Sequence, residues 1–414
     1  MIRILFLTRS LNSGGAQRQL TKLVHALDKS CFEVAVAVFY DGGLFWKEME
    51  KAPGVSLFSL GKRGRWDLHR VWSSAREIAR TWNPDVIYGF REEGNILALP
   101  LARLTRAKIV WGIRRSTKKL PTHDALAFGL FWLGAVMSYA ADKVVYNSLC
   151  GLETYVNRGY SEYNALIIPN GFDTAYFHPN PEAGKRIRSS WSVSDREFLI
   201  GSVGRLDPVK GHEMFLEAAA LVAGSHPEAR FVIVGKGSDR YLNMLKSRAG
   251  HLGVAERMIW AGEYGQMADI YNALDILALC SKEEGCPNVV GEAMACSVPC
   301  AAHDVGDAAR IIGDAGMVIA PGSIEAMARA WDTLMTLSED GRRDLGHHAR
   351  NRIIREYGLE SMVARTARLL EGLVPSGKGS PVGSWPREER LPGKVRPISH
   401  NGECGSLSSL SGRR

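Results

Sequence analysis

The sequence of 414 residues contains no long uninterrupted hydrophobic run. Its most apolar stretch, residues 126–141, is broken by two glycines and is shorter than the roughly 20 residues that a membrane-spanning helix needs. We expect a buried or interfacial helix there. No secretory signal is visible either, because the short apolar run of residues 2–7 is followed at once by Arg9 and a glycine loop.

Cysteines are few, and neither sign of charge is in large excess. Seven cysteines, an odd number, do not indicate a disulfide framework, so we expect a protein of the reduced cytosolic compartment. The 52 Lys and Arg residues stand against 44 Asp and Glu residues, which gives a net charge of +8. This mild excess argues against nucleic acid as a partner and fits an anionic ligand or an acidic membrane surface.

Signals for a bound metal are missing as well. No Asp-x-Asp pair occurs, so the chain offers no obvious carboxylate cage for a metal-bound diphosphate. Cys296, Cys300 and His303 have a suggestive spacing, but their side chains would diverge around a buried strand. We expect core cysteines there, no metal and no bound cofactor.

The chain does contain a regular alternation of apolar runs, glycine turns and amphipathic runs, which is typical of βαβ units. The predicted strands of the first part are residues 2–8, 33–39, 55–57, 86–88, 109–112, 143–146 and 165–168. After the turn formers at 179–181 the pattern restarts, with strands at 198–203, 230–234, 258–260, 276–279, 299–302 and 317–319. The fold class is therefore α/β, with two doubly wound parallel sheets.

This pattern predicts two Rossmann-like domains, residues 1–181 and 182–353, then a helical segment at 354–376. Residues 377–414 are rich in Gly, Ser, Pro and Arg without apolar periodicity, so we expect a disordered tail. Ligands of open α/β sheets bind beyond the carboxyl ends of the strands. The chemistry should therefore lie in a central cleft between the two domains.

The strongest local signal directly follows the predicted strand 276–279. Gly285 permits close backbone approach, and Pro287 suits the first turn of a helix. The N–H groups of Asn288 and Val289 would then form an anion site at the helix N-terminus.

Two glutamates flank that anion site. Glu284 precedes it and Glu292 lies about one turn inside the helix, so both could lie beside one bound phosphate. Each carboxylate accepts several hydrogen bonds, which suits vicinal sugar hydroxyls. The alternative is a capped surface helix with two solvated glutamates.

Two further loops follow predicted strands. Arg205 and Lys210, after strand 198–203, suit a diphosphate, although a solvated basic loop is the alternative. Gly14 and Gly15, after the first strand, let the backbone approach an anion or serve only tight packing.

Two basic clusters lie in the first domain, where we expect them near the apolar helix 126–141. They could hold the chain on anionic lipid or bind an acceptor phosphate, and a solvated face is the alternative. Their members are Lys62, Arg63, Arg65, Arg114, Arg115, Lys118 and Lys119.

Taken together, these motifs resemble glycosyltransferase family 4. The resemblance rests on residues 168–173 (IPNGFD) with Phe177 and Pro179, on the 204–211 loop, and on the Glu-x7-Glu spacing of Glu284 and Glu292. It covers roughly residues 1–370 and implies a retaining, metal-independent transferase of the GT-B fold. Residues 1–181 would then be the acceptor domain and 182–353 the donor domain.

The resemblance also implies roles for single residues. Arg205 and Lys210 would bind the donor diphosphate, and Glu284 the hydroxyls of the transferred sugar. Glu292 would bind the ribose. The remaining donor contacts would come from Gly14, Gly15, Gly262, Glu263, Gly285, Asn288 and Val289.

The chain departs from the family pattern at two places. Gln17 stands where many relatives have Glu after Gly-Gly-Ala, and Arg114, Arg115 and Ser116 stand near the place of a catalytic-site His. His123 is the nearest candidate for that first-domain contact.

We therefore expect an enzyme of the hexosyltransferase class that uses a nucleotide sugar, with UDP as the expected nucleotide. The acceptor would be a cell-envelope, polysaccharide or lipid-linked glycan, and the enzyme would be cytoplasmic, with or without peripheral attachment to the inner membrane face. A nucleotide-sugar epimerase and a non-catalytic nucleotide-sugar-binding subunit are the alternatives.

Overall fold

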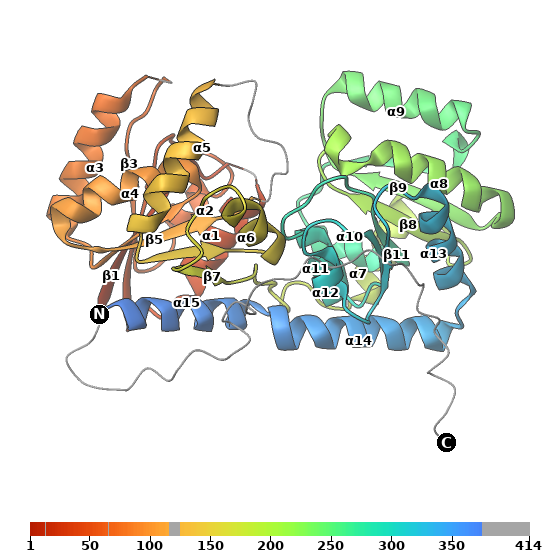
Figure 1. The fold of residues 1–414 in the computed structure, drawn as a ribbon. Coiled ribbons are helices and arrows are strands. Elements are labelled where there is room, and N and C mark those ends of the chain that lie inside the picture. Colours follow the sequence, from red (N-terminus) through yellow and green to blue (C-terminus); the bar gives the residue numbers. More distant parts are fainter. Residues whose placement is uncertain (13, 65, 116–124, 375–414) are drawn as a thin grey trace. The chain divides into compact units, whose positions relative to one another are not determined.

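The computed structural model contains two parallel β-sheets, each interleaved with helices (Figure 1). It describes residues 1–12, 14–64, 66–115 and 125–374. Several predictions fall outside the described residues: the tail 377–414, His123, and the basic residues Arg65, Lys118 and Lys119.

The first sheet has seven parallel strands in the order β3-β2-β1-β4-β5-β6-β7. Strand order changes direction between β1 and β4, and the loops after two such strands part to leave room for a ligand. The strands are β1 (Ile2–Thr8), β2 (Phe32–Val38), β3 (Val55–Ser59), β4 (Val86–Phe90), β5 (Lys108–Ile113), β6 (Lys143–Tyr146) and β7 (Ala165–Ile167).

The second sheet has six parallel strands in the order β10-β9-β8-β11-β12-β13. They are β8 (Phe198–Val203), β9 (Ala229–Val234), β10 (Met258–Gly262), β11 (Ile276–Leu279), β12 (Cys300–His303) and β13 (Met317–Ile319). All thirteen predicted strands are confirmed, with bounds that differ by two residues or fewer. Helices cover both faces of a parallel sheet, so its strands form nearly continuous apolar runs that are readable in sequence.

Helices of the first half connect its strands. They are α1 (Gly15–Ala26), α2 (Trp46–Glu50), α3 (Leu68–Trp82), α4 (Glu92–Thr105), α5 (Ala125–Met137) and α6 (Leu149–Val156). The apolar helix expected at 126–141 is α5, which ends at Met137 and continues as a 3-10 turn over Ser138–Ala140. Phe131 and Ala135 of α5 are buried, whereas Trp132 and Val136 are exposed.

Helices of the second half pack in the same way around a core that includes Trp331, whose indole contacts the rings of Phe215 and Phe231. They are α7 (Pro181–Ser190), α8 (His212–Ser225), α9 (Asp239–His251), α10 (Met267–Ala273), α11 (Asn288–Ala295), α12 (Ala308–Ile312) and α13 (Ile324–Thr336). Two short 3-10 turns, Pro208–Lys210 and Ala255–Arg257, complete this half.

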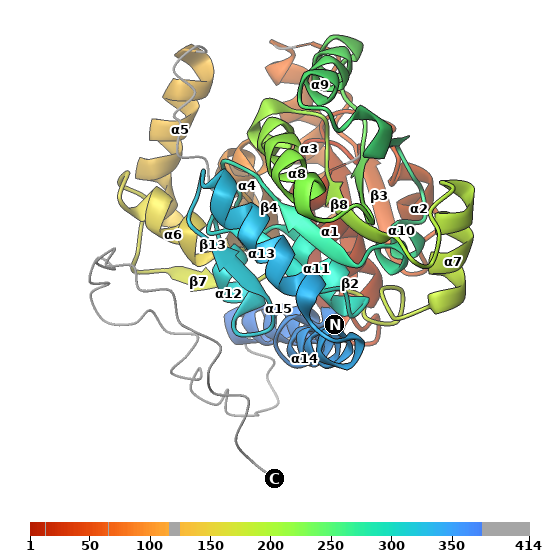
Figure 2. The same ribbon diagram turned by 90° about the vertical axis from the view of Figure 1, so that its right-hand side faces the viewer.

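The last two helices, α14 (Glu339–Tyr357) and α15 (Leu359–Leu373), follow one another end to end (Figure 1) and are seen nearly along their axes in Figure 2. Helix α14 packs on α11, and α15 packs on α1 of the first half. Backbone hydrogen bonds from Phe172 N to Tyr357 O (2.8 Å) and from Leu359 N to Phe172 O (2.9 Å) hold the junction between them. The chain thus returns to the first half through α15, while the division at residues 181 and 182 stays a prediction.

Helix α7 approaches α10 closely at Gly184, which has no side chain to keep the backbones apart. A Cβ atom there would collide with the carbonyl oxygen of Asn272, whereas a Cβ atom at Gly250 of α9 would meet nothing within 4 Å. We expect Gly184→Ala to lower the free energy of unfolding by about 1–3 kcal/mol, as overpacking does. Gly250→Ala is the matched control and should leave it unchanged or raise it by up to about 1 kcal/mol. Urea unfolding measures both, and equal stability of the two variants would contradict this packing.

Candidate functional site

The candidate site is built around the N-terminus of α11, which follows β11 through the loop 280–287. Pro287 has extended angles (φ −72°, ψ 99°) and precedes the first helical residue, so it is the N-cap. From the sequence, Pro287 was expected in the first turn of the helix. Asn288 and Val289 begin the helix. The first N–H groups of a helix have no partner within it and point along its axis. These N–H groups can therefore bind an anion, and the anion site stays a prediction.

The turn at Gly306 and Asp307 contacts the loop before α11 and fixes its backbone. Asp307 N donates to the Gly285 carbonyl (2.8 Å), and Gly306 adopts a left-handed conformation (φ 60°). A Cβ atom at Gly306 would collide with the Gly285 carbonyl oxygen, so a larger residue does not fit. The backbone at Gly285 is thus held rigidly beside the helix N-terminus.

Glu284 is held by two donors. Lys210 Nζ donates to its Oε1 atom at 2.7 Å, and Ser281 Oγ donates to the same oxygen at 2.7 Å. The Glu284 side chain is only 11% exposed, and that of Lys210 is 26% exposed. The sequence placed these two residues in one site, and the structure brings them into contact.

The loop that carries Lys210 approaches the end of β11 because of Gly211. This glycine is left-handed (φ 69°), and a Cβ atom on it would collide with the carbonyl oxygen of Cys280. Arg205, on the same loop, points elsewhere: its side chain is 79% exposed and pairs with Asp207 at 3.5 Å. The structure therefore separates the two cations that the sequence grouped.

Glu292 is the most buried charge of the site, with a side chain that is 4% exposed. Its Oε1 atom accepts a hydrogen bond from Arg18 Nη1 at 3.2 Å, and its Oε2 atom accepts one from the Tyr271 hydroxyl at 2.8 Å. Burial and the Glu292 carboxylate together raise the pKa of Tyr271 well above its usual value. Both glutamates are engaged inside the protein, so the alternative of two solvated glutamates is wrong.

Helix α1 of the first half brings the glycine loop to α11. A Cβ atom at Gly15 would lie 2.9 Å from Asn288 Nδ2, and Asn170 Nδ2 donates to Asn288 Oδ1 at 2.8 Å. The Gln19 side chain exchanges two hydrogen bonds with the Gly171 backbone, at 3.0 and 3.1 Å. Gly14 and Gly15 are therefore next to the N-terminus of α11.

A second contact between the halves lies behind the site. Asp307 accepts hydrogen bonds from Leu149 N (2.8 Å) and Cys150 N (3.0 Å) at the N-terminus of α6. Burial raises the pKa of this carboxyl, and the two N–H groups oppose that rise. The turn that fixes Gly285 is thus also anchored to the first half.

Arg18, Tyr271 and Ser281 are site residues that the sequence did not single out, and Asn170 was noted only as part of the 168–173 motif. Arg18 lies three residues after Gly15, and that proximity was the only available signal for it. For Tyr271 there was none, because it reaches Glu292 from a different helix, α10.

Gly262 is the last residue of β10 and Glu263 follows it, and both are exposed. Gly262 is left-handed (φ 73°), and its carbonyl accepts a hydrogen bond from Gly235 N at 2.7 Å. Their proposed contact with the donor stays a prediction.

In the first half, Arg114 directly follows β5, close to where the family pattern has a histidine. Its guanidinium lies 4.4 Å from the centroid of the Phe90 ring, and its charge opposes the rise that burial causes in the pKa of Tyr88. His123, the other candidate, lies outside the described residues.

The three residues with metal-like spacing are buried in the core, as expected: Cys296, Cys300 and His303 are 4%, 0% and 1% exposed. Burial raises the pKa of the Cys300 thiol and lowers that of His303. Within the described part of the chain, no three His, Cys, Asp or Glu residues cluster as metal ligands would. None of the helices in that part is long and apolar enough to cross a membrane.

Comparisons with known proteins match both halves. A model described as "Glycosyltransferase Family 4" matches residues 13–176, and one described as "Glycosyl transferases group 1" matches residues 197–336.

Similar curated proteins act on cell-envelope molecules by name. One is the "Lipopolysaccharide core biosynthesis mannosyltransferase LpsB" of Rhizobium meliloti, 26% identical over 52% of this chain and 63% of its own length. Another, from Mycolicibacterium smegmatis, is a "GDP-mannose-dependent alpha-(1-6)-phosphatidylinositol monomannoside mannosyltransferase", 30% identical over 50% of this chain and 56% of its length. The chain thus spans about three fifths of these relatives.

Solved structures share the fold. Anabaena Alr3699/HepE in complex with UDP superposes with a TM-score of 0.78 at 21% identity, covering 90% of this chain and 100% of that one. WaaG, a glycosyltransferase involved in lipopolysaccharide biosynthesis, superposes with a TM-score of 0.65 at 18% identity, covering 89% and 100%. With both halves matched and two Rossmann-like sheets in tandem, this chain belongs to glycosyltransferase family 4 and has the GT-B fold.

Proposed function

We propose that this protein transfers a sugar from a nucleotide diphosphate sugar to a cell-envelope, polysaccharide or lipid-linked acceptor, with retention at the anomeric carbon. The observation that carries the proposal is the pair of buried glutamates on α11 and its preceding loop, each held by a cation. Carboxylates fixed beside a helix N-terminus can bind sugar hydroxyls while the helix binds phosphate.

The donor would lie across the start of α11. Its diphosphate would accept hydrogen bonds from Asn288 N and Val289 N and pair with Lys210, while Arg205 would have to turn inward from Asp207. Glu284 would hold the transferred sugar and Glu292 the ribose. Gly262 and Glu263 would contact the base, and Gly14, Gly15 and Gly285 would offer backbone to the donor.

The transfer breaks the bond between the anomeric carbon and the diphosphate oxygen and forms one to the acceptor oxygen on the same face. The acceptor proton passes to the departing diphosphate oxygen. Lys210 and the N–H groups of α11 would stabilise the negative charge that develops on that leaving group. Binding geometry would supply much of the rate enhancement.

The names of similar proteins support both the donor class and the acceptor class. HepE was solved with UDP, and the M. smegmatis relative is named for GDP-mannose. We propose a UDP-sugar. A thermal-shift panel of UDP- and GDP-sugars tests this, since a ligand at 100 times its Kd stabilises by about 2.7 kcal/mol.

Replacement of Glu284 tests the placement of the sugar. We expect Glu284→Ala to lower kcat for the identified donor by about 10² or more, because a contact to the transferred sugar is lost, while UDP affinity changes little. Glu283→Gln, one residue away on the same loop, is the control and should keep wild-type turnover. Unchanged turnover in Glu284→Ala would refute the placement. Product formed from donor alone would indicate an epimerase, and donor binding without turnover in any acceptor mixture would indicate a binding subunit.

The proposed reaction proceeds without a metal or other cofactor, because Lys210 and the N-terminus of α11 neutralise the diphosphate. We expect dialysis against EDTA to leave turnover unchanged within a factor of about two, well below the tenfold change that 1.4 kcal/mol would cause. Loss of turnover that added manganese or magnesium restores would contradict this mechanism.

We further propose that the protein is cytoplasmic and attaches to the inner membrane face through α5. Phe128, Trp132, Leu133 and Val136 form an exposed apolar surface on that helix. Apolar side chains of this kind insert into the membrane interface, and nearby cations such as Arg115 favour anionic lipid.

Co-sedimentation with anionic vesicles tests the attachment. Binding should fall with added salt, because surface charges are screened over about 10 Å at 0.1 M ionic strength. The double variant Trp132→Ser and Val136→Ser should bind at least tenfold more weakly, by loss of apolar burial. Leu221→Ser, at an exposed leucine of α8, is the control. Absence of binding at low salt would refute the attachment.

A further inference from the structure

A pocket of about 660 Å³ lies in the first half, apart from the residues around α11. It is built where the first sheet changes strand order. Arg9 follows β1, Phe39 and Tyr40 follow β2, Lys62 follows β3, and Glu93 follows β4. Ligands of doubly wound sheets bind at this kind of place, beyond the carboxyl ends of the strands.

The walls of the pocket are mostly apolar. Trp66, Leu68 and Trp72 come from the start of α3 and the residues before it. The side chains of Trp66 and Leu68 are 74% and 62% exposed, which is unusual for large apolar groups that border a cavity. The remaining walls come from α4 and α5 and consist of Ile96, Leu97, Pro100, Leu126, Ala127 and Leu130.

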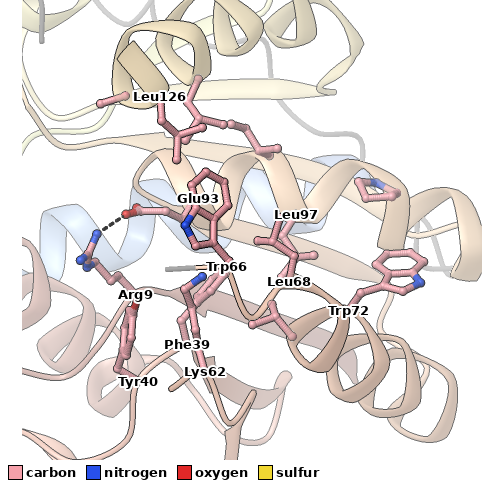
Figure 3. A pocket seen from close by; sticks show the side chains of 15 residues that line it. Arg9, Phe39, Tyr40, Lys62, Trp66, Leu68, Trp72, Glu93, Leu97 and Leu126 are labelled. Atoms are coloured by element: carbon pink, nitrogen blue, oxygen red, sulfur yellow. Dashed lines mark hydrogen bonds and ion pairs between the residues drawn. The ribbon is translucent and has the colours of Figure 1, made fainter. Parts of the chain in front are cut away.

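The polar groups gather at one end of the pocket (Figure 3). Arg9 Nη1 donates to Glu93 Oε1 at 2.6 Å. Tyr40 lies between two cations, with Arg9 at 5.4 Å and Lys62 at 6.0 Å from its ring centroid. Arg9, Lys62 and Glu93 thus place charged groups at this end, whereas Trp72 and Leu68 lie toward the opposite side in Figure 3.

We infer that this pocket binds an amphipathic acceptor, with its apolar chain between α3, α4 and α5 and its anionic head group at Arg9 and Lys62. The inference rests on the proposed function in that it names the class of molecule that receives the sugar. A phosphate head suits the cations, because arginine binds phosphate through paired hydrogen bonds and lysine as a point charge.

The walls contributed by α4 and α5 favour a hydrocarbon chain over a sugar ring in that part of the pocket. A sugar ring needs hydrogen-bond partners on several sides, and the side chains of α4 and α5 that line the pocket offer none apart from Glu93. A hydrocarbon chain needs only apolar surface. Burial of each methylene contributes about 0.8 kcal/mol, so the affinity of the ligand would rise about fourfold for each carbon added to its chain.

Binding of hexyl, octyl and decyl phosphate to the full-length protein tests the inference by calorimetry below their micelle concentrations. We expect Kd to fall about fourfold per methylene along the series. Octyl phosphate should bind at least tenfold more tightly than octyl glucoside, which has the same chain and no charge. Independence of chain length would overturn the apolar site, and equal binding of the two octyl compounds would overturn the anionic head group.

Two variants locate the site. Ala127→Phe would fill the pocket from α5 and should weaken octyl phosphate by at least tenfold, while Ala364→Phe, at an exposed alanine of α15, is the matched control. Lys62→Gln should remove most of the preference for phosphate over glucoside, and Lys51→Gln, an exposed lysine, should not. Unchanged binding in both test variants would place the alkyl phosphates elsewhere and overturn the inference.

Nucleotide binding separates this inference from the proposed function. UDP affinity should be unchanged in Ala127→Phe and Lys62→Gln, which also shows that both variants are folded. A protein that binds alkyl phosphates as expected but no nucleotide sugar would refute the proposed function and keep the pocket. A protein that transfers sugar yet binds no alkyl phosphate would overturn the inference about the pocket and keep the proposed function.

Discussion

The buried carboxylate of Glu292 is the constraint on which the rest of the site depends. A charge that is removed from water must be paired and hydrogen-bonded, and loss of one partner of such a pair costs about 3–5 kcal/mol. Here the partners are Tyr271 of the second half and Arg18 of the first. The charge therefore requires α1 to lie against α11, which also brings Gly15 beside Asn288 and lets Gln19 bind the Gly171 backbone.

The two halves share an architecture and differ in what their strand ends present. In the second half, the ends of β8 and β11 carry Lys210 and Glu284, and a helix N-terminus follows. In the first half, the strand ends carry cations, an ion pair and a pocket lined by hydrocarbon. A two-substrate reaction fits this difference, since a nucleotide diphosphate needs charge and backbone N–H groups whereas an amphipathic acceptor needs apolar surface.

Much of the fold could be predicted because parallel strands covered on both faces form apolar runs that end at glycines and turn formers. Site residues that directly follow a strand could be predicted for the same reason. Glu284, Lys210 and the start of α11 are within ten residues of β8 or β11, so finding the strand nearly locates them. Helix α5 was harder to place, because its apolar residues cover every side and no periodicity distinguishes the buried face of Phe131 from the exposed face of Trp132.

The sequence by itself determined the two doubly wound sheets, the family and the loops that carry the site, because strand periodicity and turn residues are local. Only the tertiary structure decided which side chains meet. It turned Lys210 toward Glu284 and left Arg205 with Asp207, although both cations lie on one loop. It supplied Arg18 and Tyr271 from distant helices, and it closed an apolar pocket from the ends of four strands and three helices. Contacts of this kind join residues that are far apart in the chain, and they depend on how the helices pack, which no local pattern specifies.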